Sequence, residues 1–324
     1  MKKINLSIVL IGIILFMSAM MVYMLFSLRD GEKKKDQVYL VVKSTDESTD
    51  FWVNVVKGAN VAATELGVEV IAVGPNSEID IAQQIHIMEE IIEKKPEAIA
   101  IAACDYELLR EVCEKAMKQG ITLVTYDSDV NTKKKHSFVG TNSINAARRL
   151  AHEVGVQSKG QGQVAIISHV EGAFTAKERI EGFVRGLNSY PQMEVVGDIR
   201  YAKDSRQRAY ENAIELIEQY PKLRVLYGTN EGSILGISDA IIEKGLKNEI
   251  YVVGFDMNLD IAQRIEEDVI DVIMVQRPFN MGYIAIREAI DVMNGKETEN
   301  IDTSAVLINK ENLFLPENQK LIVP

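Results

Sequence analysis

Short polar side chains follow an apolar segment that is predicted to be a buried strand. Residues Thr122–Tyr126 are β-branched, aliphatic or aromatic, and the chain then continues with Asp127, Ser128 and Asp129. Side chains of this kind favour turns and do not continue a buried strand. Ligands of open α/β sheets bind at the carboxyl ends of the strands. The two carboxylates are therefore candidates for hydrogen bonds to a small polar ligand.

The same order of apolar segment and polar end recurs along the chain. Three further apolar segments run into Ser44-Thr45-Asp46, Thr229-Asn230-Glu231 and Phe255-Asp256. His169 also stands at the end of a predicted strand and is expected at the edge of a cleft. Because parallel strands of one sheet end at the same edge, we expect a ligand site at that edge.

No catalytic motif accompanies these polar groups. The chain has no Gly-x-Ser-x-Gly elbow, no Walker loop and no His-Glu-x-x-His sequence. The four histidines are scattered over predicted helix, loop, helix and strand end, and they predict no metal cluster. Gly160-Gln161-Gly162 precedes a predicted strand, whereas a dinucleotide-binding loop follows one. The sequence thus predicts a binding protein without catalytic residues, metal or cofactor, and an enzyme is the least favoured class.

Composition limits the partners that the chain can have. It has 324 residues, 47% of them hydrophobic, which suffices for one large or two medium domains. A net charge of −11 disfavours nucleic-acid binding, which depends on clustered Lys and Arg. Cys104 and Cys113 are expected as buried free thiols, in preference to a disulfide or a redox pair.

The amino terminus carries an apolar segment. Residues 8–28 are uncharged and rich in Ile, Leu and Met, and they follow Lys2 and Lys3. About 20 such residues span a bilayer, whereas the apolar region of a signal peptide has about 7–15. We therefore expect residues 1–36 to form an uncleaved cell-membrane anchor and its tether, with the remaining chain outside the cytoplasm, at the cell surface or in the periplasm. A long cleaved signal peptide is the alternative.

Predicted strands and helices alternate from residue 38 onward. A helix is expected over residues 78–94, for example, where apolar residues from Ile81 to Ile92 recur every three or four positions. Such alternation predicts parallel sheets with right-handed crossovers. The pattern restarts near Thr141, so we expect an α/β protein of two similar, doubly wound lobes joined by a hinge. A cleft between such lobes is a preferred ligand site.

Several short motifs occur in a fixed order between residue 37 and the carboxyl terminus. They are Ser44-Thr45-Asp46, Phe51-Trp52, Lys57-Gly58-Ala59, Thr125–Asp129, Val139–Asn142, Arg179–Phe183, Gly228–Glu231, Val253–Asp256 and Gln276. Each motif alone is weakly specific, but their order resembles that of the sugar-binding proteins of ABC transporters of the ribose and galactose type. The resemblance implies the type I periplasmic-binding-protein fold. It also implies lobes of residues 37–141 plus 277–303 and of residues 142–276 plus 304–324.

The resemblance further assigns roles to single residues. Phe51 and Trp52 match an aromatic pair that stacks on a sugar ring, although aromatics of this kind also bury a helix in a core. Asp127 matches a carboxylate that accepts hydrogen bonds from hydroxyls, and a helix or turn cap is its alternative role. Arg179 matches an arginine that grips ring and hydroxyl oxygens; otherwise it would be a solvated helix residue.

The remaining matched residues are polar. Asn230, Asp256 and Gln276 match the rest of the ligand-binding set, with local turn hydrogen bonds as the alternative role of each. Ser128 stands where the family often has Arg, and it is counted with the expected ligand-binding residues. Ala102 stands where ribose-type members carry an amide. The ligand is therefore left open among hexoses, other pentoses, polyols and a furanosyl signal such as autoinducer-2.

The resemblance implies a membrane partner. An ABC permease that receives the sugar is expected, and a membrane histidine kinase that senses the ligand-bound form is the alternative. The related repressors need a basic DNA-binding headpiece before the first strand, and residues 1–37 hold an apolar segment instead.

Overall fold

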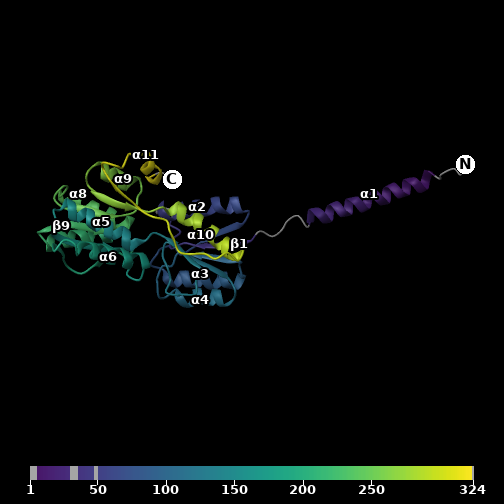
Figure 1. Cartoon of the computed structure of the whole chain (residues 1–324), viewed down its shortest axis with the longest axis horizontal. Coiled ribbons are helices and arrows are strands. Elements are labelled where there is room, and N and C mark those ends of the chain that lie inside the picture. Colours follow the sequence, from purple (N-terminus) through teal and green to yellow (C-terminus); the bar gives the residue numbers. More distant parts are fainter. Residues whose placement is uncertain (1–5, 30–35, 47–49, 323–324) are drawn as a thin grey trace. The chain divides into compact units, whose positions relative to one another are not determined.

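The computed structural model describes residues 6–29, 36–46 and 50–322 (Figure 1). The chain divides into two compact units, residues 1–36 and residues 37–324. The first unit contains helix α1 (Leu6–Arg29). Among the residues that the structure describes, no helix combines the length and the apolar character needed to cross a membrane. The predicted anchor at residues 8–28 is thus not confirmed, and the side chains of residues 8–12 and 25–28 lie outside the described part.

The second unit is built on two sheets. The strands of the first sheet are β1 (Gln37–Val41), β2 (Glu69–Val73), β3 (Ala98–Ile101), β4 (Thr122–Tyr126), β5 (Ser137–Gly140) and β12 (Ile301–Asp302). The strands of the second are β6 (Gln161–Ser168), β7 (Gln192–Val195), β8 (Arg200–Tyr201), β9 (Leu223–Gly228), β10 (Tyr251–Phe255), β11 (Val272–Val275) and β13 (Val306–Asn309). All pairs are parallel except β11 with β13.

The two sheets repeat one strand order. The first runs β12-β5-β4-β3-β1-β2, and the second runs β13-β11-β10-β9-β6-β7 with β8 paired to β6. In each sheet the direction of the order reverses once, between β1 and β3 and between β6 and β9. Such a reversal opens a crevice at the carboxyl ends of the two strands, where ligands bind. The prediction of an α/β protein with two similar parallel sheets is therefore confirmed, whereas the exact lobe boundaries stay a prediction.

Helices cover both faces of each sheet. Those packed on the first sheet are α2 (Asp50–Leu66), α3 (Ile81–Lys94), α4 (Arg110–Lys118) and α10 (Pro278–Met293). Those of the second sheet are α5 (Ser143–Gln157), α6 (Phe174–Leu187), α7 (Arg206–Gln219), α8 (Glu231–Lys244) and α9 (Leu259–Glu266), and the short α11 (Pro316–Ile322) follows β13. In β1, Val38 and Leu40 face the α2–α10 side while Tyr39 and Val41 face the α3–α4 side. This alternation buries both faces of a central strand, as a doubly wound sheet requires.

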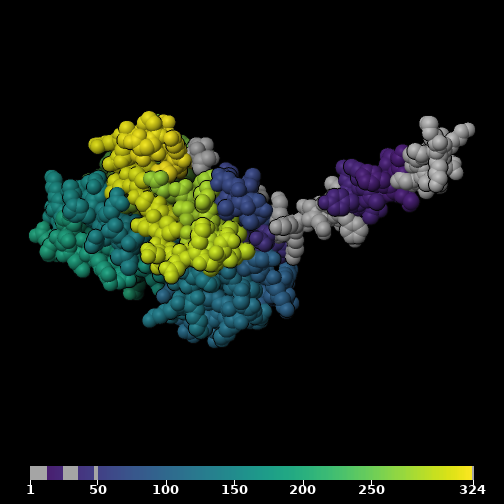
Figure 2. All heavy atoms as spheres, turned by 45° about the vertical axis from the view of Figure 1, so that its right-hand side comes forward, coloured from purple at the N-terminus to yellow at the C-terminus, as the bar shows by residue number. Residues whose placement is uncertain are grey.

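The chain passes between the sheets at several places. It crosses from β5 to β6, from β11 to α10 and β12, and from β12 to β13. Consequently α10, late in the sequence, packs against α2 near its beginning, and Figure 2 shows the late residues, in yellow and yellow-green, beside the blue early ones. Crossings of this kind are the natural hinges of a two-lobed protein.

Two local features bear on the site. Helix α3 begins at Ile81, later than predicted, because the side chain of Asp80 accepts a hydrogen bond from the Gln83 backbone N–H and caps the helix. Glu78 therefore lies in a loop and not in a helix. Cys104 and Cys113 are buried free thiols, as predicted.

Candidate functional site

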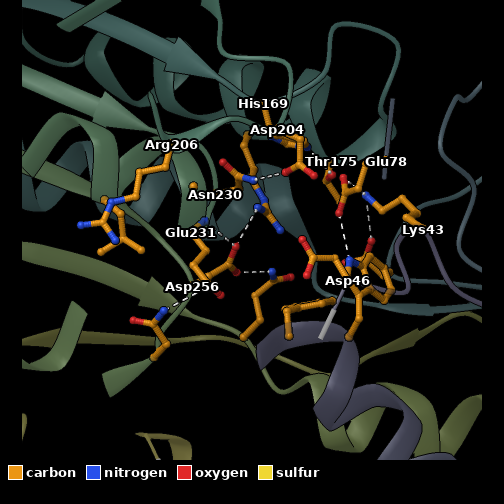
Figure 3. A pocket seen from close by; sticks show the side chains of 18 of the residues that line it. Lys43, Asp46, Glu78, His169, Thr175, Asp204, Arg206, Asn230, Glu231 and Asp256 are labelled. Carbon is orange, nitrogen blue, oxygen red and sulfur yellow. Dashed lines mark hydrogen bonds and ion pairs between the residues drawn. The ribbon is translucent and has the colours of Figure 1, made fainter. Parts of the chain in front are cut away.

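A cavity of about 380 Å³ lies among the carboxyl ends of strands from both sheets (Figure 3). From the first sheet and its helices it is lined by Lys43, Asp46, Phe51, Trp52, Glu78 and Asp127. The second sheet contributes side chains that follow β6, β9, β10 and β11 and that begin α6, α7, α8 and α9. A cavity of this size is within the range of small-molecule sites, and its walls come from both halves of the unit.

All but one of the predicted site residues line this cavity. They are Phe51, Trp52, Asp127, Arg179, Asn230, Asp256 and Gln276. Ser128 is the exception: it is fully buried, and its hydroxyl donates to Asp127 Oδ2 at 3.0 Å. Ser128 is thus a support for the Asp127 carboxylate, and the prediction that it contacts a ligand directly is not supported. The sequence motif carried both residues, but only the sheet geometry tells which one faces the cavity.

Trp52 is held rigidly at the cavity wall. Its indole Nε1 donates to Glu78 Oε1 at 3.0 Å, and its ring makes edge contacts with Phe51 and Tyr126 at centroid distances of 5.0 and 6.5 Å. The side chain belongs to the hydrophobic cluster of the first sheet and also borders the cavity. Trp52 is therefore a core residue that also borders the cavity, and its stacking on a ligand stays a prediction. Phe51 is less buried and lies at the same wall.

Lys43 joins two carboxylates in a buried network. Its Nζ lies 3.3 Å from Glu78 Oε2 and 3.4 Å from Asp127 Oδ2. Burial lowers the pKa of Lys43, but the Glu78 and Asp127 carboxylates outweigh burial and raise it. The lysine is therefore a fixed cation that holds both acceptors in place. No role was predicted for Lys43 from the sequence, and Glu78 was placed in the helix predicted over residues 78–94.

Arg179 is the corresponding cation of the second sheet. Its Nη1 donates to the Thr229 carbonyl at 2.6 Å and lies 3.7 Å from Asp256 Oδ2. Its guanidinium carbon lies 4.4 Å from the centroid of the Phe255 ring. Gln276 donates to Asp256 Oδ1 at 2.7 Å, so that both oxygens of this carboxylate have partners. Arg179 Nε is buried and has no hydrogen-bond partner among the described residues.

His169 lies at the end of β6, at the cleft edge where the sequence placed it. It is 2% exposed, its Nδ1 lies 2.8 Å from Thr229 Oγ1, and its Nε2 lies 3.2 Å from Thr175 Oγ1. Burial lowers the pKa of His169 well below its usual value, and the charges of Lys43 and Arg179 add to this effect. The imidazole is therefore neutral at physiological pH and acts as a hydrogen-bonding group, not as a cation.

The far wall is acidic. Asn230 Nδ2 lies 3.4 Å from Asp204 Oδ1, and Asn258 Nδ2 donates to Glu231 Oε1 at 2.9 Å. Burial raises the pKa of Asp204 to about 7 and that of Glu231 to about 8. Neither residue was singled out from the sequence as a ligand contact, although Glu231 stands in the polar end of β9.

The set of groups around the cavity suits a polyhydroxylated ligand. Carboxylates can accept hydrogen bonds from hydroxyls, and amides can accept or donate them. An arginine can donate to ring or hydroxyl oxygens, and aromatic rings can pack on C–H faces. Among the described residues, no group of His, Cys, Asp and Glu has the arrangement of a metal site. The cavity is therefore lined by many hydrogen-bonding side chains that come from both halves of the unit.

Comparison with known proteins agrees with this geometry. Residues 38–297 match the family described as the periplasmic binding protein domain. The ribose import binding protein of Bacillus subtilis is 26% identical over 273 residues, which are 83% of this chain and 85% of that protein. The D-allose-binding periplasmic protein of Escherichia coli is 26% identical over 264 residues, 78% and 83% of the two chains.

A solved structure extends the comparison to three dimensions. The carbohydrate transporter solute-binding protein of Agrobacterium radiobacter, in complex with D-arabinose, superposes with a TM-score of 0.86 at 29% identity. The match covers 90% of this chain and 100% of that one. With the family match, the paired parallel sheets and the cavity between them, the chain belongs to the periplasmic-binding-protein family and has its type I fold.

Proposed function

We propose that the protein is the solute-binding component of an ABC sugar transporter and that it works outside the cytoplasm. Its ligand is a monosaccharide or a similar polyhydroxylated molecule, bound in the cavity between the sheets. The observation that carries the proposal is the cavity wall itself: Lys43-held carboxylates and Trp52 on one side, Arg179 and Asp256 on the other. The similar proteins named above bind ribose, D-allose or D-arabinose, which supports a monosaccharide.

The mechanism is ligand-stabilised closure of two lobes. We assign residues 37–141 plus 277–303 to one lobe and residues 142–276 plus 304–324 to the other, in agreement with the membership of the two sheets. A sugar reaches Asp127 and Arg179 at once only when the lobes are closed, so binding shifts the population towards the closed form. A permease that recognises the closed form then receives only loaded protein.

Asp127→Asn is expected to remove most of the sugar-induced rise in melting temperature of residues 37–324. A ligand that binds only the native state stabilises it by about 2.7 kcal/mol at a concentration of 100 times Kd. The measurement is a thermal-shift screen of monosaccharides and polyols, and we expect at least one to raise the melting temperature of the wild type. Asp198→Asn, at an exposed carboxylate outside the cavity, is the matched control and keeps the full shift. A screen in which no sugar or polyol raises the melting temperature of the wild type would refute the proposed ligand class.

Membrane attachment and the choice of partner are proposed from the sequence and from the closure mechanism. The apolar run of residues 8–28 would tether the binding unit, and tethering raises the effective concentration at a membrane partner. We expect the full chain to stay in the membrane fraction after carbonate extraction and residues 37–324 to be released. Equal release of both chains would exclude the tether.

Capture of membrane proteins with and without sugar identifies the partner. Sugar-dependent capture of a permease supports transport, whereas sugar-dependent capture of a histidine kinase identifies the alternative, a sensor.

A further inference from the structure

Glu231 presents one carboxyl oxygen that the protein leaves without a partner. The residue is the first of α8, lines the cavity and is 9% exposed. Its Oε1 accepts from Asn258 Nδ2 at 2.9 Å. Its Oε2 is buried and has no hydrogen-bond partner among the described residues. A buried carboxyl oxygen without a partner is costly, so this atom is a candidate for direct contact with the ligand.

The groups that face Glu231 are acidic. Asp256, after β10, receives a hydrogen bond from the Glu231 backbone N–H at 3.3 Å through its Oδ2. Asp50, at the start of α2, and Asp204, before α7, act on Glu231 electrostatically in the same direction as Asp256. Figure 3 shows Glu231, Asp204 and Asp256 among the residues that line the cavity. The negative charges of these carboxylates disfavour ionisation of Glu231.

The cationic side chains that line the cavity form ion pairs with carboxylates other than Glu231. Lys43 bridges the two acids of the first sheet, Arg179 pairs with Asp256, and Arg206 lies 2.7 Å from Asp239 and 3.5 Å from Asp260. Within the described part of the chain no cation lies at ion-pair distance from Glu231. An ionised Glu231 would thus be buried without a counter-charge, which is strongly unfavourable.

We propose that Glu231 meets the ligand as a neutral carboxylic acid and donates a hydrogen bond through Oε2 to a ligand oxygen. The inference rests on the proposed function and narrows its ligand class: the ligand presents a ring, carbonyl or hydroxyl oxygen here, and not an ammonium group. An amino sugar would need the ionised carboxylate as a salt-bridge partner. A neutral sugar gains from the acid, because the acid places a donor beside the Asp204 and Asp256 carboxylates, while the nearby Asn258 amide already donates to Glu231 Oε1.

The titration of Glu231 agrees with this assignment. Burial raises its pKa to about 8, with Asp256 and Asp50 adding to the effect, while the Asn258 hydrogen bond opposes it. The position at the start of α8 acts in the opposite direction and favours the ionised form. Below pH about 8 the free protein already carries the proton. Above that pH the proton must be taken up on binding, so affinity falls by up to about tenfold per pH unit.

The test uses Glu231→Gln and Glu231→Ala. Glutamine reproduces the neutral acid, with an acceptor at Oε1 and a donor in the place of Oε2, so it keeps most of the affinity for D-arabinose that alanine loses. Between pH 8 and pH 9.5 the wild type loses affinity, and the Gln variant loses clearly less. Titration calorimetry measures both. Stronger binding of D-glucosamine than of D-glucose by the wild type, together with loss of that preference in Glu231→Gln, would overturn the proposal.

A second measurement needs no ligand. In protein labelled with ¹³C at the Glu carboxyl carbons, the resonance missing from Glu231→Gln is expected to titrate with a midpoint near 8. A midpoint near the ordinary glutamate value of about 4.3 would contradict the neutral acid. If no monosaccharide binds at all, the proposed function fails. The carboxyl titration then still decides separately whether Glu231 is neutral.

Discussion

Arg179→Met is expected to weaken sugar binding by at least about 100-fold, a loss of about 2.7 kcal/mol or more. The guanidinium is 3% exposed, it pairs with Asp256, and its Nε has no partner among the described residues. Methionine fills much of the volume but cannot donate to a sugar oxygen. The substitution also leaves the Asp256 carboxylate buried without its cation, which costs about 3–5 kcal/mol of folding stability. Titration calorimetry and urea unfolding measure the two effects.

Two further variants separate binding from stability. Arg179→Met combined with Asp256→Asn removes the buried unpaired charge, so it regains stability while sugar affinity stays low. Arg185→Met changes an exposed arginine on the same helix, α6, and alters neither quantity by more than about 0.5 kcal/mol. Normal sugar affinity in a folded Arg179→Met protein would remove this residue from the site.

Gly172→Ala is expected to lower sugar affinity by at least about tenfold although Gly172 does not line the cavity. Gly172 follows β6 of the second sheet, and its carbonyl accepts from the Tyr106 N–H, which follows β3 of the first sheet, at 3.1 Å. A Cβ at Gly172 would lie 2.8 Å from Asp105 Cγ and would overlap the carboxylate. Asp105 cannot turn away freely, because its Oδ1 accepts from the backbone N–H groups of Glu107 and Leu108, each at 2.8 Å. The methyl group therefore holds the lobes apart at this contact.

The double variant Gly172→Ala with Asp105→Ala is the matched test of that explanation. Removing the carboxylate makes room for the new methyl group, so closure and part of the lost affinity return. Small-angle scattering with and without sugar follows closure, and calorimetry follows affinity. Because the clash lies between the lobes and not within one of them, the free energy of unfolding in urea is expected to change by less than about 1 kcal/mol. Equal affinity in Gly172→Ala and wild type would show that this contact is not part of the closed form.

The fold could be predicted from the sequence because each lobe repeats one local pattern. Apolar strands alternate with amphipathic helices, and both faces of the central strands are buried. The two-residue strands β8 and β12 and the short helix α11 were not predicted, because such short elements carry no periodicity. The predicted anchor rested on hydropathy, and the described residues do not confirm it.

The site residues that directly follow apolar strands were predicted from the sequence. Site residues whose position depends on tertiary structure, such as Lys43 and Glu78, were missed. Lys43 and Asp127 are distant in sequence, and only the neighbouring positions of β1, β3 and β4 bring them to 3.4 Å. Glu78 faces the cavity because Asp80 delays the start of α3, a one-turn effect that periodicity does not resolve. Ser128 does not line the cavity and instead donates to Asp127 Oδ2, a difference that the sequence motif does not reveal. Tertiary pairing therefore adds the charges that fix the predicted acceptors.

The crystal structure of residues 37–324 with the sugar selected by the thermal-shift screen tests the central claim most directly. We predict one sugar in the cavity, with hydrogen bonds to Asp127 from one lobe and to Arg179 from the other, and with Gly172 in contact with Asp105. A sugar bound to one lobe alone, or on the outer surface with the cavity unoccupied, would contradict the account.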